Sequence, residues 1–453
     1  MTVLNFKPVT VETEPNEISA AHFLVSENAG RIRWVRERGR WLVFDGTVWR
    51  DGDCHVQRLI QGYCGTLAVD TKKASWGSWR AVAAVDRLMR GHEEINASIS
   101  AFDADPWLLG TPGGVVDLRT GELRPATPED MITRTTAVAP DFDRRPERWI
   151  RFLRDVTCGD GELADWLQRV CGYALTGSVR EQCFWFLYGP GGNGKSVFVG
   201  TLAGILGSYH KTAADNVFVR QKYEDHPAGL ADLVGARLVT ATEIGRGQEW
   251  HVQRLKAVTG GDMIKARFMR QDFFEFKPQF KLIISGNFKP ALDAVDPAIV
   301  RRMRVVPFRA RFPEPDPELP DRLREEWPAI LGWMIRGCLK WRERGLAPPE
   351  AVRAETEEYL SEQDLIGRFI DECCELDAPG TPPGTGFRCR SSKLYAAWAE
   401  WCRNQGENPG TNKSFSAELT KRGFRKTRTR FGIEFWGIAI RQDGGAFRDG
   451  DAR

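Results

Sequence analysis

The chain has 453 residues, a length that predicts about three domains. Of these residues 42% are apolar and 16 are tryptophan, which predicts hydrophobic cores and excludes a chain that is disordered throughout. Its net charge is only +3, which excludes affinity for nucleic acid through overall charge and leaves local basic clusters as the only source. The sequence holds no apolar run of roughly 18 residues and no signal-peptide pattern, so we expect a cytoplasmic protein of a bacterial host, without a membrane partner. Ten scattered cysteines form no C-x-x-C pair, which favours buried free thiols over a zinc site.

Residues 1–142 are expected to form an N-terminal α+β domain. A β-hairpin is predicted over residues 41–49, because Asp45-Gly46 supplies the positive φ of a tight turn. A second hairpin is predicted over residues 114–123. Three D-x-D triplets stand in or beside this domain, at residues 51–53, 103–105 and 141–143. Paired carboxylates can hold the metals of a nucleotidyl transferase, but no buried strand aims these, and we interpret them as structural.

Residues 143–180 are expected to form a helical collar. Apolar side chains recur at helical spacing along two stretches, one beginning at Trp149 and the other at Trp166. The collar leads into an apolar run of strand length, residues 183–188, and so into the ATPase domain predicted over residues 181–312.

A glycine-rich loop follows that strand and fits the phosphate-loop pattern G-x-x-x-x-G-K-[ST]. Its residues are Gly189, Pro190, Gly191, Gly192, Asn193, Gly194, Lys195 and Ser196. The glycines let backbone N–H groups face phosphates, and the helix that follows adds its positive dipole end. The pattern therefore predicts an ATP site in which Lys195 reaches the β- and γ-phosphates and Ser196 holds Mg²⁺.

Two further strands of the ATPase domain end in polar side chains. Residues 237–243 end at Glu243, which is expected to activate the attacking water and to help hold Mg²⁺, with Thr242 where an aspartate is more usual. Residues 279–287 end at Asn287, a candidate sensor of the γ-phosphate. Beyond them, Arg301 or Arg302 is the candidate for an arginine that reaches a neighbouring subunit's nucleotide.

A basic and aromatic hairpin is predicted between those two strands. Its candidate DNA contacts are Lys265, Arg267, Phe268 and Arg270. Basic side chains that alternate with rings are typical of surfaces that hold a phosphate backbone and stack bases. A solvated basic strand is the alternative interpretation.

The remaining chain is divided into a helical connector over residues 313–375, a compact unit over 376–441 and a disordered tail over 442–453. Residues 350–375 are expected to form one helix. The compact unit has the order helix, helix, hairpin, which suggests a winged helix that binds DNA or, alternatively, protein. Its basic candidates for DNA contact are Lys421, Arg422, Arg425, Lys426 and Arg428.

These motifs together resemble the superfamily 3 helicases, in the branch of phage and plasmid primase-helicases and the poxvirus primase-helicase. The resemblance rests on the loop at 189–196, on Ala241-Thr242-Glu243, on Leu255–Arg267 with its Thr-Gly-Gly-Asp, on Gly286–Pro290 and on Arg301-Arg302. It implies an α/β fold with an AAA+-like P-loop NTPase core. It also implies a ring of identical subunits, most simply a hexamer, that hydrolyses ATP between subunits and draws single-stranded DNA past the hairpin.

We therefore expect an ATP-dependent DNA helicase of phage or plasmid replication. An origin-binding initiator that uses ATP only as an assembly switch is the first alternative, although such a switch needs no catalytic base such as Glu243. A primase-helicase with its own priming activity is the second. Because the N-terminal domain is short for that task, we expect a separate primase as the partner where priming is needed.

Overall fold

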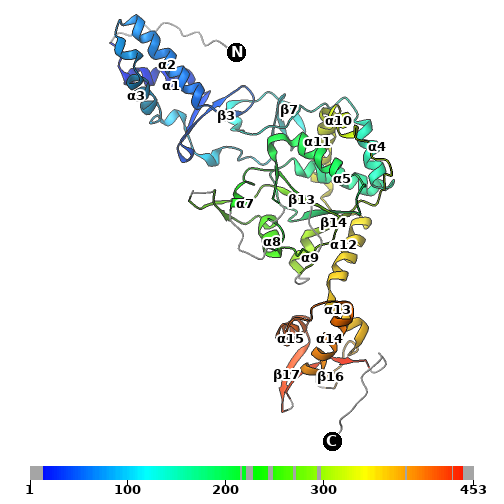
Figure 1. Cartoon of the computed structure of the whole chain (residues 1–453). Helices are drawn as coiled ribbons and strands as arrows, with labels where there is room; N and C mark the ends of the chain where they lie inside the picture. The colour runs from blue at the N-terminus through cyan, green and yellow to red at the C-terminus, as the bar shows by residue number, and fades with distance from the viewer. Residues whose placement is uncertain are drawn as a thin grey trace. The chain divides into compact units, whose positions relative to one another are not determined.

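The computed structural model describes most of the chain (Figure 1). The described residues are 14–214, 217–220, 228–242, 248–268, 272–292, 297–382, 385–430 and 432–441. Two compact units divide the chain: the first holds residues up to 291 and 301–353, and the second holds residues 292–300 and those from 354 onward. Among the helices of the described ranges, none has the length and hydropathy that a membrane crossing requires.

The first unit begins with helices packed on a small sheet. The helices are α1 (Glu17–Asn28), α2 (Asp53–Asp70) and α3 (Trp79–Met89), and the strands are β1 (Ile32–Val35), β2 (Arg40–Phe44), β3 (Trp49–Asp51) and β4 (Asn96–Ala97), in the order β3-β2-β1-β4. Strands β2 and β3 pair antiparallel, which confirms the first predicted hairpin. Asp45 closes its turn by accepting from the Thr47 and Val48 amides at 2.8 and 2.9 Å.

A second sheet follows, made of β5 (Leu108–Thr111), β6 (Gly114–Asp117) and β7 (Glu122–Arg124). Strands β6 and β7 pair antiparallel, with Val116 opposite Leu123, and this confirms the second predicted hairpin. Gly114 adopts φ +130°, and a Cβ there would lie 2.2 Å from the Arg124 carbonyl oxygen, so the turn into β6 requires glycine.

The predicted collar is helical. Its helices are α4 (Glu147–Val156) and α5 (Gly161–Ala174), and α5 packs along the later helix α11 (Trp327–Arg344), which follows the short α10 (Leu319–Arg324). The two backbones approach closely, because a Cβ on Gly172 would lie 2.0 Å from the Cys338 amide nitrogen. Trp149 and Trp166 are fully buried in the large core that these helices share with the neighbouring sheet.

The central sheet of the first unit is wholly parallel, in the order β14-β8-β13-β10-β9. Its strands are β8 (Phe184–Tyr188), β9 (His210–Thr212), β10 (Leu238–Ala241), β13 (Lys281–Gly286) and β14 (Met303–Pro307). Strands β8, β10 and β13 are almost continuously buried and mainly apolar, as expected for parallel strands covered on both faces, whereas the edge strand β9 is polar and largely exposed. The helices between these strands in the first unit are α6 (Lys195–Leu206), α7 (Ala228–Ala231) and α8 (Val252–Gly260), while α9 (Pro297–Arg302) begins in the second unit and ends in the first.

Two buried cations fasten α5 to the amino ends of the strands. Arg237, just before β10, donates to the Leu175 carbonyl at 2.7 Å. Lys281, the first residue of β13, donates to the Thr176 carbonyl and to the Ser178 carbonyl at 3.4 Å. Positive charge suits the carbonyl-rich end of a helix, although burial still lowers the pKa of Lys281 well below its usual value. The end of α5 therefore lies at the amino edge of the sheet, opposite the carboxyl edge that carries the glycine-rich loop.

The second unit has its own core and two small sheets. Its helices are α12 (Glu350–Gln363, whose first residues belong to the first unit), α13 (Leu365–Cys373), α14 (Ser391–Gln405) and α15 (Asn412–Lys421), and its strands are β15 (Cys374–Leu376), β16 (Arg388–Arg390), β17 (Arg425–Thr429), β18 (Gly432–Trp436) and β19 (Ile438–Ile440). The predicted order of helix, helix, hairpin is confirmed by α14, α15 and the β17–β18 pairing. The single helix predicted over 350–375 is wrong, because Asp364 caps a new helix by accepting from the Gly367 amide at 2.9 Å.

All ten cysteines are free, as expected. The expectation that they are buried holds for most of them, but Cys54 and Cys158 are exposed and Cys373 is half-buried.

Candidate nucleotide site

The glycine-rich loop lies between β8 and α6, where a parallel sheet presents the carboxyl ends of its strands. Three of its glycines, Gly191, Gly192 and Gly194, have φ of +104°, +60° and +84°, which side chains with a Cβ rarely adopt. The loop also has little room beneath it: a Cβ on Gly194 would lie 2.6 Å from a Val156 methyl carbon of α4. The strand, loop and helix predicted around the motif are thus all present.

Lys195 is buried at the start of α6, and its amino group is held by oxygen atoms. It donates to the Gly189 carbonyl at 2.7 Å, to Asn193 Oδ1 at 2.9 Å and to Asn287 Oδ1 at 3.0 Å. Burial lowers the pKa of Lys195 to about 8, because desolvation disfavours the charged form. Neutral oxygens satisfy its donors without supplying the negative charge that phosphate oxygens would bring.

The loop is anchored to the segment that follows β14. Asn193 donates from Nδ2 to the Phe308 carbonyl at 3.0 Å, and the Phe312 amide donates to the Gly192 carbonyl at 3.1 Å. Gly189 must lack a side chain, because a Cβ there would meet the Asn193 amide group at 2.0 Å. Asn193 therefore positions both the loop and the Lys195 amino group.

A cavity of about 650 Å³ opens over this loop, within the range typical of small-molecule sites. Gly191 to Val197 and Asn287 line one part of it. The rest is lined by Arg148, Arg151, Phe152, Asp155, Phe312, Glu314, Pro315, Asp316, Leu319 and Arg322. None of this second group was predicted from the sequence: α4 was interpreted only as part of a collar, and its spacing gave no sign that one face covers the loop.

Two of the arginines in the cavity wall are paired. Arg148 lies 3.0 Å from Glu325, and Arg322 pairs with Asp316. Arg151, one turn along α4 from Arg148, has no carboxylate partner among the described residues. The wall therefore combines apolar contact surface with cations, as a nucleotide requires.

Asn287 and Lys195, which were predicted as parts of one site, are brought together by the sheet. Asn287 follows β13, which pairs directly with β8, Gly286 lying opposite Tyr188. Ser196 is exposed at the start of α6, with an oxygen of the hard type that Mg²⁺ prefers. The roles of these side chains toward ATP and Mg²⁺ stay predictions.

Glu243 lies outside the described residues. Its strand, β10, is parallel to β13, with Ala241 opposite Ile284, so it ends at the same edge of the sheet as β8 and β13. One strand, β13, separates it from β8. The described part of the chain therefore brings Thr242, the residue before Glu243, to the edge that carries the loop.

Arg301 and Arg302 stand in the last turn of α9, the first exposed and the second half-buried. Neither lines the cavity described above. Their role at a neighbouring subunit's nucleotide stays a prediction.

The predicted basic hairpin is present as β11 (Ile264–Ala266) and β12 (Phe274–Phe276), which pair antiparallel with Lys265 opposite Glu275. Phe268 stacks on Phe274 with ring centroids 5.3 Å apart, and the Arg267 guanidinium lies 5.0 Å from the Phe273 ring. Phe268 and Phe273 are 39% and 54% exposed. Cations and exposed rings therefore share this hairpin, while Arg270 lies outside the described residues.

The basic residues of the second unit differ in their surroundings. Arg422 donates to Asp364 at 3.0 Å, and Lys421 to Glu418 at 3.0 Å. Arg425, Lys426 and Arg428 are exposed along β17. The disordered tail predicted over 442–453 lies outside the described residues.

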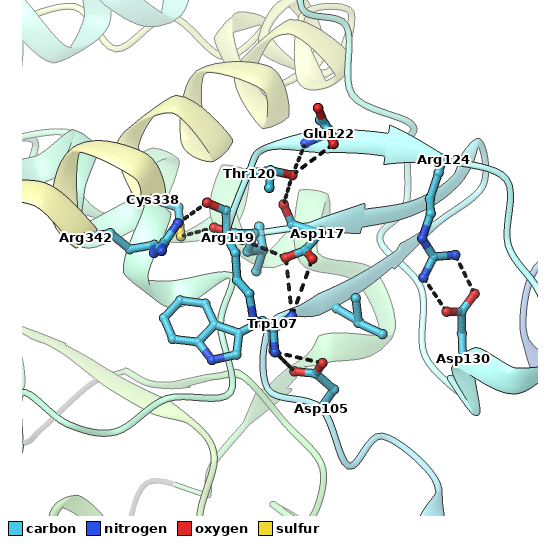
Figure 2. A network of polar contacts seen from close by, with 12 residues as sticks. Asp105, Trp107, Asp117, Arg119, Thr120, Glu122, Arg124, Asp130, Cys338 and Arg342 are labelled. Atoms are coloured by element: carbon cyan, nitrogen blue, oxygen red, sulfur yellow. Dashed lines mark hydrogen bonds and ion pairs between the residues drawn. The ribbon is translucent and has the colours of Figure 1, made fainter.

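The D-x-D carboxylates are engaged in turns and ion pairs. Arg119 donates to both oxygens of Asp105 at 2.9 Å, and Asp105 also accepts from the Trp107 amide at 2.9 Å (Figure 2). Asp103 accepts from the Thr133 amide at 2.9 Å. Within the described ranges, no group of three or more metal-binding side chains is present. The contacts of Asp103 and Asp105 fit the structural interpretation of that triplet.

Two family models match the chain, in adjacent regions. A model described as D5 N terminal like matches residues 21–158, which include most of the predicted N-terminal domain and α4. A family of unknown function, DUF5906, matches residues 187–302, which include the glycine-rich loop and the basic hairpin.

Viral proteins are among the curated relatives of the chain. A candidate helicase of Acanthamoeba polyphaga mimivirus is 27% identical over 60% of this chain and 31% of its own length. A candidate helicase of Frog virus 3 is 26% identical over 58% of this chain and 28% of its own length. A candidate primase of African swine fever virus is 22% identical over 67% of this chain and 34% of its own length. The chain thus spans about a third of the length of these relatives.

Among solved structures, the C-terminal region of NrS-1 has a similar fold. The TM-score is 0.53 at 12% sequence identity, over 94% of this chain and 100% of that one. At this identity the likeness concerns the fold alone.

Proposed function

We propose that this chain, which belongs to the D5-type primase-helicase family, carries an ATP-driven motor that unwinds DNA during the replication of a phage or plasmid. The observation that supports it most is the position of the Lys195 amino group. It lies 3.0 Å from Asn287 Oδ1, at the carboxyl edge of a parallel sheet, inside a cavity of about 650 Å³. A lysine that is desolvated there, and that has only neutral oxygens as partners among the described residues, is prepared to receive phosphate oxygens.

In the proposed reaction, the glycines of the loop let its backbone approach the triphosphate, and Lys195 holds the β- and γ-phosphates. Lys195 would exchange the neutral Asn287 oxygen for a charged phosphate oxygen. The freed Asn287 amide then hydrogen-bonds the γ-phosphate and orients the attacking water, and Glu243 removes its proton. Ser196, with Glu243, would hold Mg²⁺, which supplies positive charge to the phosphates when bound.

DNA is the proposed partner of the motor, in the form of a single strand. The β11–β12 hairpin offers cations and exposed phenylalanine rings, a pairing that suits a strand whose bases are unstacked. A ring of identical subunits would place this hairpin in a common channel and would let Arg301 or Arg302 reach a neighbour's nucleotide. Ring size and partners such as a separate primase belong to the same proposal.

An unwinding assay on a forked duplex tests the proposal. Wild-type protein should displace a strand only with ATP and Mg²⁺, and Lys195→Ala should abolish both unwinding and ATP turnover. Glu243→Gln should retain ATP binding and lose hydrolysis. Lys211→Ala, a change of an exposed lysine in β9, is the matched control and should behave as wild type.

The same assay separates the motor from an initiator that uses ATP only to assemble. An initiator would bind duplex origin DNA and assemble with ATP, and Glu243→Gln would leave its output intact. Strand displacement by the Lys195→Ala variant at the wild-type rate would refute the proposed site.

A further inference from the structure

The small sheet of the second unit has one face in the core and one face outside it. In the order β16-β18-β17, Cys389 lies opposite Phe435 and Phe435 opposite Lys426. Cys389 and Phe435 are both buried in the core of this unit. Because side chains alternate along a strand, the neighbours of these residues point to the other side, which we call the outer face.

A tryptophan stands at the centre of the outer face, flanked by an arginine on each side. Trp436 of β18 lies opposite Arg388 of β16 and opposite Arg425 of β17. The Arg388 guanidinium is 5.8 Å from the Trp436 ring centroid. Trp436 is only partly buried and is not a member of the core cluster that contains its neighbour Phe435.

Charge on this sheet is strongly one-sided. The three strands hold Arg388, Arg390, Arg425, Lys426 and Arg428 against a single carboxylate, Glu434. Arg388, Arg425, Lys426 and Arg428 form no ion pair with the described carboxylates. By the strand register, Arg388 and Arg425 share the outer face with Trp436, whereas Lys426, opposite Phe435, and Arg428 point to the other side. Two arginines without an ion pair to the described carboxylates therefore flank one half-exposed ring.

The helix that a duplex-reading module would place in the major groove is equipped differently. On α15 and just after it, Lys421 pairs with Glu418 at 3.0 Å, and Arg422 pairs with Asp364 and lies 3.7 Å from Glu418. Breaking those pairs would be part of any contact with phosphates through them. Lys421 and Arg422, at the end of this helix, are thus engaged with carboxylates, whereas Arg388 and Arg425 of the sheet stand beside a ring and have no such partner among the described residues.

We propose that the outer face binds single-stranded DNA, with an unpaired base stacked on Trp436 and the flanking phosphates held by Arg388 and Arg425. A duplex keeps its bases stacked inside, so it offers phosphates to this face but no ring for Trp436. An acidic peptide would use the arginines and leave the ring without a partner. The inference rests on the proposed function only for the choice of DNA as the polymer.

Anisotropy of a fluorescein-labelled 20-nucleotide dT oligomer, titrated with the full chain in the absence of ATP, measures this contact. Trp436→Ala should weaken binding at least about fivefold, because one lost base–ring stack is worth roughly 1–3 kcal/mol. Trp436→Phe should retain most of the affinity, since it keeps a ring. Trp79→Ala, a change of a tryptophan that is 76% exposed in the first unit, should leave the affinity unchanged.

The cations give a second, independent measurement. The double change Arg388→Ala and Arg425→Ala should weaken binding of the oligomer and reduce its dependence on salt concentration, because fewer counterions are released. A duplex of the same length should lose affinity with the arginines but not with Trp436→Ala. Thermal unfolding of each variant verifies that the unit is intact.

Unchanged affinity of Trp436→Ala for the oligomer, or a loss confined to the duplex, would overturn the inference. Failure of the proposed ATP-driven function would be seen in another assay, as ATP turnover that persists in the Lys195→Ala variant. The oligomer titration contains no nucleotide and does not measure turnover. Loss of oligomer binding in Trp436→Ala together with persistent turnover in Lys195→Ala would keep the outer face and remove the motor.

Discussion

The unusual state of Lys195 predicts that nucleotide binding depends on pH above neutrality. Its amino group is buried among three neutral oxygens, and burial lowers its pKa to about 8 in the free protein. Phosphate oxygens would restore the charged form and raise the pKa in the complex. The free protein therefore loses its proton as the pH rises through about 8, whereas the complex keeps it, so binding weakens with rising pH.

The size of the effect follows from the fraction of protonated Lys195. This fraction falls from about 0.76 at pH 7.5 to about 0.09 at pH 9.0, so affinity for a non-hydrolysable ATP analogue should fall about eightfold, or about 1.2 kcal/mol. At pH 8.5, binding should take up about three quarters of a proton. Isothermal titration calorimetry in two buffers of different ionisation enthalpy measures both quantities.

Lys195→Arg is the matched control, because a guanidinium stays charged throughout this range. Its affinity for the analogue should not vary between pH 7.5 and 9.0, whatever its absolute value. A wild-type affinity that is flat over this interval, or an arginine variant that keeps the slope, would refute the reasoning.

Three further predictions concern neighbouring features. Asn287→Asp places a carboxylate about 3 Å from the Lys195 amino group and should raise the pKa of Lys195. The pH at which analogue affinity begins to fall should therefore be higher than in the wild type. An unchanged pH in the same titration would show that the two side chains are not coupled. Gly194→Ala forces a Cβ into a backbone with φ +84° and to 2.6 Å from α4. Restoring the loop geometry for binding then costs roughly 1–2 kcal/mol, so analogue affinity should fall at least about fivefold; wild-type affinity would contradict the need for this loop geometry. Gly172→Ala would bring a Cβ to 2.0 Å from the α11 backbone and should lower the free energy of unfolding by about 1–3 kcal/mol. Gly62→Ala on α2, where a Cβ would meet no atom within 4 Å, is the control and should not lower it. Equal melting temperatures for the two variants would contradict the close packing of α5 on α11.

Much of the candidate site could be predicted because its parts follow strands directly. The loop at 189–196 and Asn287 each come after a buried apolar run, and parallel strands bring such positions to one edge. The hairpins were predictable for a related reason, since Asp45-Gly46 fixes a turn locally. In each case the signal lies within a few residues of the structure that it predicts.

The cavity wall could not be predicted, because it depends on contacts between distant segments. Phe152 and Arg151 carry no mark that their helix covers the loop, and the Phe308 and Phe312 backbone groups that hold Asn193 and Gly192 have no signature in a sequence. The break at Asp364 was missed because its capping bond competes with a helical pattern that is continuous on both sides.

The central claim is that a nucleotide occupies the loop at the carboxyl edge of the sheet. An experimental structure of the protein with Mg²⁺ and a non-hydrolysable ATP analogue tests it most directly. We predict the triphosphate over residues 190–196, with the Lys195 amino group moved from Asn287 Oδ1 to phosphate oxygens. An analogue bound elsewhere at saturation, with Lys195 still hydrogen-bonded to Asn287, would contradict the account.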